Sequence, residues 1–241
     1  MDDVLVVVPA RGGSKRICNK NIKNIGGWPM ISWPLRQLST LFKSGRVVVS
    51  TDSQKIVDLV KKYNLDVPFI RPEELSGDYV GTMPVVSHAL SWYERYVQKV
   101  KYILIVYPTA VILDYTNILK AYEIITNNSL CGCVFSAAHF AAPIQRAFYE
   151  KNGFASMISP EYLSVRSQDL EESFYDAGQF YLFRSECVRQ QKNLLDSNPI
   201  MLKLPRYEVI DIDTHEDFIF AEFVLNSRMK EKNISEFQFE S

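Results

Sequence analysis

A basic loop with two adjacent glycines follows the first apolar run of the sequence. Residues 9–21 read PARGGSKRICNKN and come directly after VLVVV at 4–8. Glycines allow backbone N–H groups to approach a ligand closely, and Lys and Arg supply positive charge. This combination suits a pyrophosphate or triphosphate, although a solvated basic turn has the same composition. The spacing of residues 9–21, called the basic loop below, matches neither a Walker loop nor the G-x-G-x-x-G dinucleotide fingerprint.

Two aspartates near the C-terminal end are candidates for a metal site. The segment YEVIDID at 207–213 is predicted to be a strand, so Asp211 and Asp213 should face the same side of it. Mg²⁺ prefers a few carboxylates completed by substrate phosphates. Thr214 and Asp217 also fit a helix capping box, which would be a purely structural role for this segment. The capping box does not involve Asp211, so it does not explain that residue. We therefore predict that Asp211 and Asp213 bind Mg²⁺ opposite the basic loop.

The cysteines and histidines do not predict a further metal site. The spacing of the cysteines fits neither a disulfide framework nor a zinc ribbon, so they are predicted to be reduced thiols in a cytoplasmic protein; they are Cys18, Cys131, Cys133 and Cys187. His88 lies inside a helical pattern, and His215 lies at the start of the last helix. His139 is the histidine that could approach a ligand.

The composition is ordinary for a globular protein. The 241 residues carry a net charge of −1, with 47% hydrophobic and 23% charged residues. This balance gives no general basic field for nucleic acid or an anionic membrane. No apolar run approaches the roughly 20 residues that span a bilayer, and MDDVLVVV does not resemble a signal peptide. We expect no nucleic-acid or membrane partner.

Apolar runs alternate with helical patterns along the first 135 residues. Strands are predicted at 4–8, 46–51, 67–70, 102–107 and 133–135, and helices at 29–42, 53–63, 82–96 and 114–128. Continuous apolar runs are typical of a parallel sheet covered on both faces, and the alternation predicts an α/β doubly wound, mostly parallel sheet. Ligands of such sheets bind at the carboxyl ends of the strands, where the basic loop lies.

Residues 136–177 interrupt this alternation and are predicted to form an inserted subdomain. They include KNG at 151–153, a hairpin-turn signal, and no long amphipathic helix. A strand follows at 178–184, then a short helix at 185–191, the strand at 207–213 and a helix at 214–230. We predict one domain over 1–230, followed by a polar tail at 231–241.

Five motifs in combination resemble the CMP-sialic acid synthetase family. They are VPARGGSKR (8–16), KN (20–21), STD (50–52), RPEEL (71–75) and IDIDT (210–214), and the resemblance spans residues 4–225. It implies a Rossmann-like fold of the nucleotide-diphospho-sugar transferase type. The implied reaction is attack by the anomeric hydroxyl of a nine-carbon 2-keto sugar acid on the α-phosphate of CTP, with pyrophosphate as the leaving group. No residue stands out as a general base.

The resemblance also implies which residues bind the nucleotide. These are Ala10, Arg11, Gly12, Gly13, Ser14, Lys15, Lys20, Asn21, Arg71, Val80 and Thr82. Asn21 would lie near the ribose or base, and Arg71 would recognise cytosine; without the resemblance, Arg71 is equally a surface arginine before a turn. Arg11, Lys20 and Asp211 would act at the reacting phosphates. Asp211 and Asp213 match the family's metal-binding acids.

Within this family, the inserted segment is most similar to enzymes that activate pseudaminic acid. The similarity lies in GTMPVVSHAL (81–90), PIQRAF (143–148) and RSQDLEESFYDAGQFY (166–181). The resemblance implies a homodimer in which the insert reaches the partner's sugar site, although PIQRAF and RSQDLEE could be interface segments alone. The implied sugar-binding residues are Tyr107, Gln145, Arg146, Arg166, Gln168, Phe180 and Tyr181, with arginine suited to a carboxylate. Two positions depart from the family pattern, Tyr107 for its glutamine and Cys18 for its proline.

Other functions stay open at this point. The same chemistry could act on N-acetylneuraminic, legionaminic or 3-deoxy-manno-octulosonic acid. A sugar-nucleotide-dependent glycosyltransferase also combines an α/β sheet with metal-binding acids, but it usually lacks a GGSKR loop. A regulatory nucleotide-binding domain would leave the insert unexplained. Products of the implied reaction are typically destined for flagellin or surface glycans.

Overall fold

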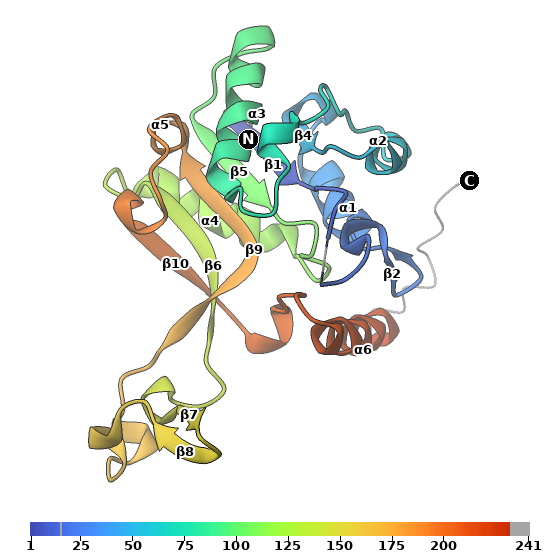
Figure 1. The fold of residues 1–241 in the computed structure, drawn as a ribbon. Helices are drawn as coiled ribbons and strands as arrows, with labels where there is room; N and C mark the ends of the chain where they lie inside the picture. The colour runs from blue at the N-terminus through green and yellow to red at the C-terminus, as the bar shows by residue number, and fades with distance from the viewer. Residues whose placement is uncertain (15, 232–241) are drawn as a thin grey trace.

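The protein is built on a six-stranded, mostly parallel sheet (Figure 1). The computed structural model describes residues 1–14 and 16–231. The strand order is β10 (Pro199–Leu204), β6 (Cys133–His139), β9 (Phe174–Arg184), β5 (Tyr102–Val106), β1 (Val4–Pro9) and β4 (Val47–Ser50). Strand β9 is antiparallel to β5 and β6, and the other neighbours pair in parallel. The predicted mixed α/β class with a mostly parallel sheet is confirmed.

Helices cover both faces of the sheet because its strands are apolar on both sides. In β1, Val4, Val6 and Val8 pack on one face with α1 (Ser32–Leu41), α2 (Gln54–Lys61) and α4 (Tyr115–Asn127). Leu5 and Val7 point to the other face, toward α3 (Thr82–Tyr96) and α5 (Ser185–Arg189). This double cover explains the continuous apolar runs of the sequence.

The last helix, α6 (His215–Glu231), packs below the carboxyl end of the sheet. Its residues Phe218 and Leu225 share an apolar cluster with Ile17 of the basic loop and with Ile210 and Ile212. A small ribbon, β2 (Asn24–Ile25) and β3 (Trp28–Pro29), follows the basic loop and joins the same cluster. The basic loop and the segment 209–213 therefore both pack on helix α6.

Two predicted strands are wrong. Residues 67–70 form no strand, because Pro68 has no N–H for a ladder; only the isolated bridges Val48–Asp66 and Thr51–Ile70 occur there. Residues 207–213 contain the end of a 3₁₀ turn, Arg206–Glu208, and then irregular chain. Ile210 and Ile212 are buried in the cluster of α6, and Val209 is buried against side chains of β6, β9 and β10, all without pairing as a strand.

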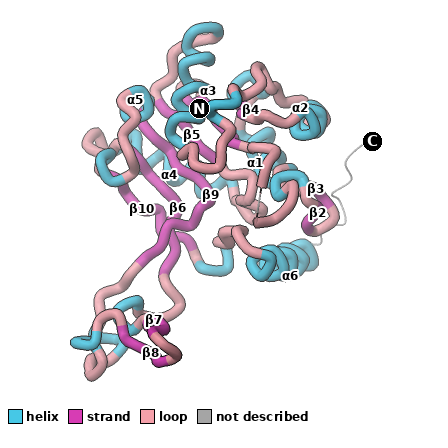
Figure 2. The backbone as a smooth tube through the Cα atoms, in the orientation of Figure 1, coloured by secondary structure: helices cyan, strands magenta, loops and turns pink. Residues whose placement is uncertain are grey.

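A long excursion, residues 140–173, connects β6 to β9 and is called the arm below. Figures 1 and 2 show that it projects away from the sheet and ends in the hairpin of β7 (Phe148–Lys151) and β8 (Phe154–Met157). Asn152 and Gly153 take positive φ values of 53° and 81°, so the hairpin turn predicted at 151–153 is confirmed. Strands β6 and β9 extend into both ends of the predicted insert. Within the described residues, no helix is long and apolar enough to cross a membrane.

Candidate functional site

The basic loop is held at the carboxyl ends of β1 and β4 by its own backbone. The N–H of Ala10 donates to the carbonyl of Ser50 at 2.9 Å. The side-chain amide of Asn21 donates to the carbonyl of Arg11 at 2.8 Å, and Asn21 is 8% exposed. Asn21 therefore closes the loop on itself. The structure places this side chain inside the loop, and its expected contact with a ribose or base stays a prediction.

Each described cation of the basic loop meets an aspartate from another element. The Arg11 guanidinium donates to Asp78 at 2.7 Å, while Arg16 and Lys20 both donate to one Asp213 oxygen, at 2.9 and 3.1 Å. The Lys20 amine also donates to the carbonyl of Ile212 at 2.6 Å. The loop and the segment 209–213 are thus joined by charge. Lys15 lies outside the described residues.

The two glycines of the loop differ in their surroundings. The N–H of Gly12 donates to Asp52 Oδ1 at 2.6 Å, and a Cβ on Gly12 would lie 2.7 Å from the Cβ of Ser53. Gly13 has no atom within 4 Å of the corresponding position. Gly13 therefore leaves room for a ligand beside the backbone.

A pocket of about 380 Å³ lies where the basic loop meets the segment 209–213. We call it the acidic pocket, and it is lined by Lys20, Tyr107, Thr109, Asp176, Gly178, Tyr181, Asp211 and Asp213. Ile210 and Ile212 are buried while Asp211 and Asp213 line the pocket, so the predicted period-two alternation holds although no strand forms. The structure brings together Lys20, both metal candidates and two of the expected sugar residues.

A bulge in β9 brings Asp176 into the acidic pocket, a residue that the sequence reasoning missed. The register changes from Phe135–Tyr181 to Ala137–Asp176 across the bulge. Gly178 has φ +59°, and a Cβ there would lie 3.1 Å from the carboxyl carbon of Asp211. The Gly178 N–H donates to Asp176 Oδ1 at 3.0 Å. An aspartate two residues before a glycine is the signal of such a turn.

Two tyrosines, Tyr107 and Tyr181, also line the acidic pocket. The Tyr181 hydroxyl donates to Asp176 at 2.5 Å, and the Tyr107 hydroxyl lies 2.8 Å from the Thr82 hydroxyl. Their rings meet edge to face at 5.7 Å, and burial raises the pKa of both phenols, so both are neutral hydrogen-bonding groups. Phe180 is fully buried in the core on the other face of the sheet. The expectation that Phe180 could contact a sugar is therefore wrong.

The carboxylates of the pocket repel one another. Reduced hydration inside the pocket, together with the neighbouring Asp213, raises the pKa of Asp211. Among the described residues, Asp211 has no hydrogen-bond partner, and no group of three or more His, Cys, Asp or Glu side chains is arranged to hold a metal. Two oxygen donors from the protein, with the remaining ligands from a substrate, still fit the chemistry of Mg²⁺.

The predicted capping box at the start of α6 is present beside the pocket. The Thr214 N–H donates to Asp217 Oδ2 at 2.7 Å, and the Asp217 N–H donates to the Thr214 hydroxyl at 3.2 Å. Burial alone would raise the pKa of Asp217, but the hydrogen bonds from Thr214 and the Asp213 N–H lower it. Asp217 is therefore occupied by the helix start, and Asp211 stays directed to the pocket.

Arg71 lies inside the protein. Its side chain donates from Nε to the Ser50 hydroxyl at 3.0 Å and from Nη2 to the Ser50 carbonyl, and only 5% of the residue is exposed. Burial lowers its pKa, while Asp52 acts in the opposite direction. The alternative of a surface arginine is wrong. Arg71 ties the segment that leads to Val80 and Thr82 to the end of β4.

The expected sugar residues of the arm do not line the acidic pocket of their own chain. Gln145 donates to the Glu171 carbonyl at 3.0 Å, and Arg146 donates to the Val165 carbonyl and the Ser167 hydroxyl. Arg166 pairs with Asp169 at 2.8 Å. Gln168 lines a separate cavity of about 390 Å³ at the root of the arm, which also includes His139. These contacts all lie within the arm or at its root.

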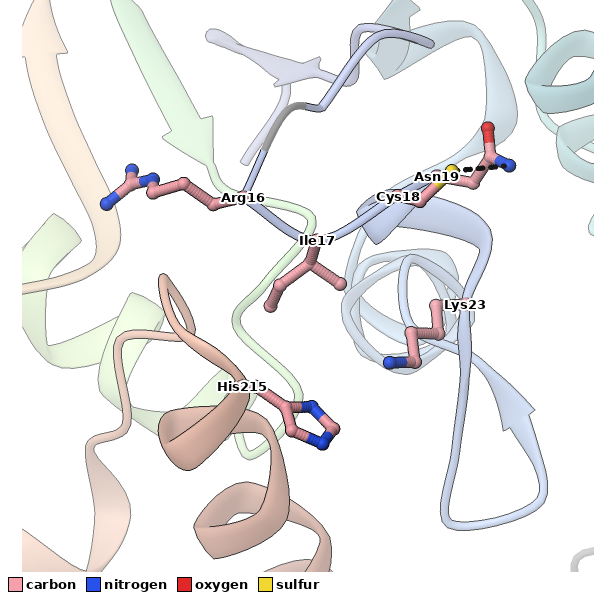
Figure 3. Close-up of a pocket in the computed structure, with 6 residues that line it drawn as sticks. All are labelled: Arg16, Ile17, Cys18, Asn19, Lys23 and His215. Atoms are coloured by element: carbon pink, nitrogen blue, oxygen red, sulfur yellow. Dashed lines mark hydrogen bonds between the residues drawn. The ribbon is translucent and has the colours of Figure 1, made fainter.

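A further cavity of about 500 Å³ lies between the turn of the basic loop and the start of α6. Figure 3 shows the Lys23 side chain and the His215 ring below this turn, with Arg16 extending away from both. The Lys23 amine lies 4.2 Å from the centre of the Phe218 ring. Cys18 is exposed on the turn, and all four cysteines are free thiols. This cavity contains no carboxylate of the acidic pocket.

Comparison with known proteins places this geometry in a family. The profile of the family described as "Cytidylyltransferase" matches residues 5–237. A pseudaminic acid cytidylyltransferase of Campylobacter jejuni serotype O:2 is 35% identical over 221 residues, covering 91% of this chain and 95% of that protein. A CMP-N,N′-diacetyllegionaminic acid synthase of Legionella pneumophila is 28% identical, covering 91% and 94%. A solved CMP:2-keto-3-deoxy-manno-octonic acid synthetase in complex with CTP matches with a TM-score of 0.68 at 14% identity, covering 93% and 99%.

Proposed function

The chain belongs to the cytidylyltransferase family, and we propose that it transfers CMP from CTP to pseudaminic acid and releases pyrophosphate. The structural observation that carries the proposal is the meeting of two oppositely charged elements at one end of the sheet. Lys20 of the basic loop contacts Asp213, beside Asp211, in a pocket walled by Tyr107 and Tyr181. A triphosphate requires a basic surface, and its cation requires nearby carboxylates. The sugar must bind beside both.

We propose that the basic loop binds the triphosphate. Backbone N–H groups at Gly13 and Ser14 and the cations of Arg11 and Lys20 would neutralise the charge that develops on the phosphate oxygens. Arg11 and Lys20 now contact aspartates, which these phosphates would replace as partners. Thr82 and the segment around Val80, anchored by Arg71, would contact the base.

Asp211 and Asp213 are the residues that would hold Mg²⁺. The cation, when bound, would stabilise negative charge on the phosphate oxygens of the substrate. Burial, and then the repulsion from Asp213, raise the pKa of Asp211; a bound cation would relieve the repulsion, which supports this assignment. Asp213 would then hold the cation while Lys20 contacts the phosphates, so the loop and the acidic segment would act on the same substrate.

The sugar site is proposed to be completed by the arm of a second subunit. The acidic pocket offers three carboxylates and one lysine, an unfavourable surface for a sugar acid unless further cations are added. Arg166 is exposed on the arm, and its planar guanidinium suits a carboxylate. The arm also exposes large apolar side chains, namely Ile144, Phe148, Tyr149, Phe154, Ile158 and Leu163. A homodimer would cover these side chains and bring Arg166, with Arg146, Gln145 and Gln168, to the partner's pocket.

We further propose that the reaction takes place in the cytoplasm and supplies an activated sugar for flagellin or surface glycans. The free thiols, three of them buried, support a reducing compartment. A glycosyltransferase is a weaker alternative, because a family match over residues 5–237 covers both the basic loop and the acidic pair.

The test is pyrophosphate release from CTP and Mg²⁺ with a panel of sugar acids. We expect turnover with pseudaminic acid and much less with N,N′-diacetyllegionaminic, N-acetylneuraminic and 3-deoxy-manno-octulosonic acids. Preference for another acid of the panel would disprove the substrate assignment and keep the chemistry. Release of a nucleoside monophosphate or diphosphate from a sugar nucleotide, without pyrophosphate release from CTP, would disprove the chemistry itself.

A further inference from the structure

Asp52 lies at the end of β4, directly beside the basic loop. Strands β1 and β4 pair in register up to Pro9 and Ser50, and the Ala10 N–H continues the ladder to the Ser50 carbonyl. Beyond this point the ladder ends. The next link is the 2.6 Å hydrogen bond from the Gly12 N–H to Asp52 Oδ1. A side chain thus takes over where the backbone pairing of the two strands stops.

The contact depends on the close approach of two chain segments. A Cβ on Gly12 would lie 2.7 Å from the Cβ of Ser53 and 3.6 Å from Asp52 Oδ1. The Ser53 N–H is itself held by the Thr51 hydroxyl at 3.1 Å. Only glycine permits this distance, so the position of Gly12 is determined by the segment that carries Asp52.

Asp52 also interacts electrostatically with Arg71. Arg71 is buried and donates to Ser50 through Nε and Nη2. Burial lowers the pKa of Arg71, and the charge of Asp52 is the first effect that opposes this lowering. The carboxylate therefore accepts a hydrogen bond from the loop and also acts electrostatically on the arginine that anchors the segment leading to Val80 and Thr82.

Two roles are conceivable for a carboxylate at this point. As a placeholder, Asp52 would occupy the Gly12 N–H until a phosphate displaced it, and its charge would oppose CTP binding. As a support, it would keep this N–H permanently and leave Gly13 and Ser14 to the ligand. The geometry favours the support, because Gly12 is enclosed by Ser53 while Gly13 faces open space.

We propose that Asp52 is a positioning residue of the nucleotide site. It holds Gly12 so that the following part of the basic loop faces the triphosphate, and it links that loop electrostatically to Arg71. The proposal rests on the proposed use of CTP and adds a residue to which the family resemblance assigned no role.

The experiment compares Asp52→Ala and Asp52→Asn with the control Asp58→Asn. Asp58 is an exposed aspartate on α2 that accepts a hydrogen bond from Gln54 at 2.8 Å. Pyrophosphate release gives the KM for CTP and for the sugar acid, and calorimetry gives CTP affinity directly. We expect Asp52→Ala to raise the KM for CTP about tenfold to a hundredfold, the range for losing a charged hydrogen bond. The KM for the sugar acid should stay unchanged.

Asp52→Asn keeps an oxygen for the Gly12 N–H but lacks the charge that acts on Arg71. Its KM for CTP should rise less than that of Asp52→Ala, and its preference for CTP over UTP should fall. The control Asp58→Asn should match the wild type in its KM for CTP and in its preference for CTP over UTP. A loss of general stability alone would not separate these two substrates or two nucleotides.

Three outcomes decide the matter. Unchanged or tighter CTP binding in Asp52→Asn would overturn the proposal and favour the placeholder. If Asp52→Ala does not fold, judged by thermal unfolding, Asp52→Asn alone decides by the same criterion. If the wild type neither binds nor turns over CTP, the proposed function fails first, and the failure is not specific to Asp52.

Discussion

The basic loop and the arm both leave the sheet at the carboxyl end of a strand, but their polar groups find partners in different places. In the loop, the cationic side chains contact two aspartates that are far away in the sequence. Arg11 contacts Asp78, and both Arg16 and Lys20 contact Asp213. In the arm, the contacts of Arg146 and Arg166 with described residues all lie within the arm. The loop is therefore tied by ion pairs to the rest of the chain outside the arm, which we call the body, whereas these arginines of the arm are not.

The difference extends to apolar surface. Ile17 anchors the loop in the cluster of α6 and is 5% exposed, whereas Phe154 and Leu163 of the arm are 76% and 68% exposed. Exposed apolar clusters on a soluble protein usually mark a binding surface. This contrast supports the proposals that one chain contains the whole phosphate and metal site and that the arm acts on a second subunit.

The largest effect is expected from the body, with Asp211→Asn and Asp213→Asn combined. We expect activity to fall about a thousandfold or more, because both proposed metal ligands are lost. Pyrophosphate release measures it. Full activity in this double variant would exclude the proposed metal role.

The single variant Asp211→Asn serves as its stability control. The pKa of Asp211 is raised, so its charged form is disfavoured in the folded state and costs stability at neutral pH. The melting temperature of Asp211→Asn should therefore equal or exceed that of the wild type. A clear drop would mean that Asp211 has a structural role.

A second, intermediate effect tests whether the arm acts on another chain. Arg166→Ala should raise the KM for the sugar acid about tenfold to a hundredfold and leave the KM for CTP unchanged. Co-expression of Arg166→Ala with Asp211→Asn should then restore about a quarter of wild-type activity, because half the dimers carry one site with both intact residues. No restoration would mean that the arm serves its own chain.

The smallest effect is expected where the two regions meet, in the bulge of β9. Gly178→Ala should lower stability by about 1–2 kcal/mol, because alanine is strained at φ +59° and its Cβ would crowd Asp211. Gly45→Ala is the matched control, since that glycine has an ordinary φ and open space around it. Thermal unfolding of both variants provides the comparison. Equal stability would show that the bulge adapts to a side chain.

Much of the body could be predicted from the sequence because its signals are local. Continuous apolar runs indicated β1 and β5, and the capping box of Thr214 and Asp217 marked the start of α6. The place of the basic loop followed from the rule that ligands bind at the carboxyl ends of strands. The alternation of Ile210 and Ile212 with the two aspartates also predicted which side chains face the pocket.

The failures concern contacts that only the fold creates. Residues 207–213 have a strand pattern, but their neighbours are α6 and the loop, so no partner strand is available. The edge strand β10 was missed, and it pairs only with β6. Asp176 reaches the pocket through a register shift of β9. Asn21 and Arg71 are buried by tertiary contacts that their sequence neighbours do not reveal.

The pairing at the root of the arm has an evolutionary consequence. His139 and Phe174 are direct partners in the antiparallel ladder of β6 and β9, so the arm begins and ends at adjacent positions. In topological terms it is a hairpin loop that has grown long, and tight turns close such ladders readily. Selection can therefore lengthen, shorten or replace residues 140–173 without rethreading the sheet. In the proposed dimer, the specificity set by one subunit's arm and the chemistry of the other subunit could then diverge as separate modules within one gene.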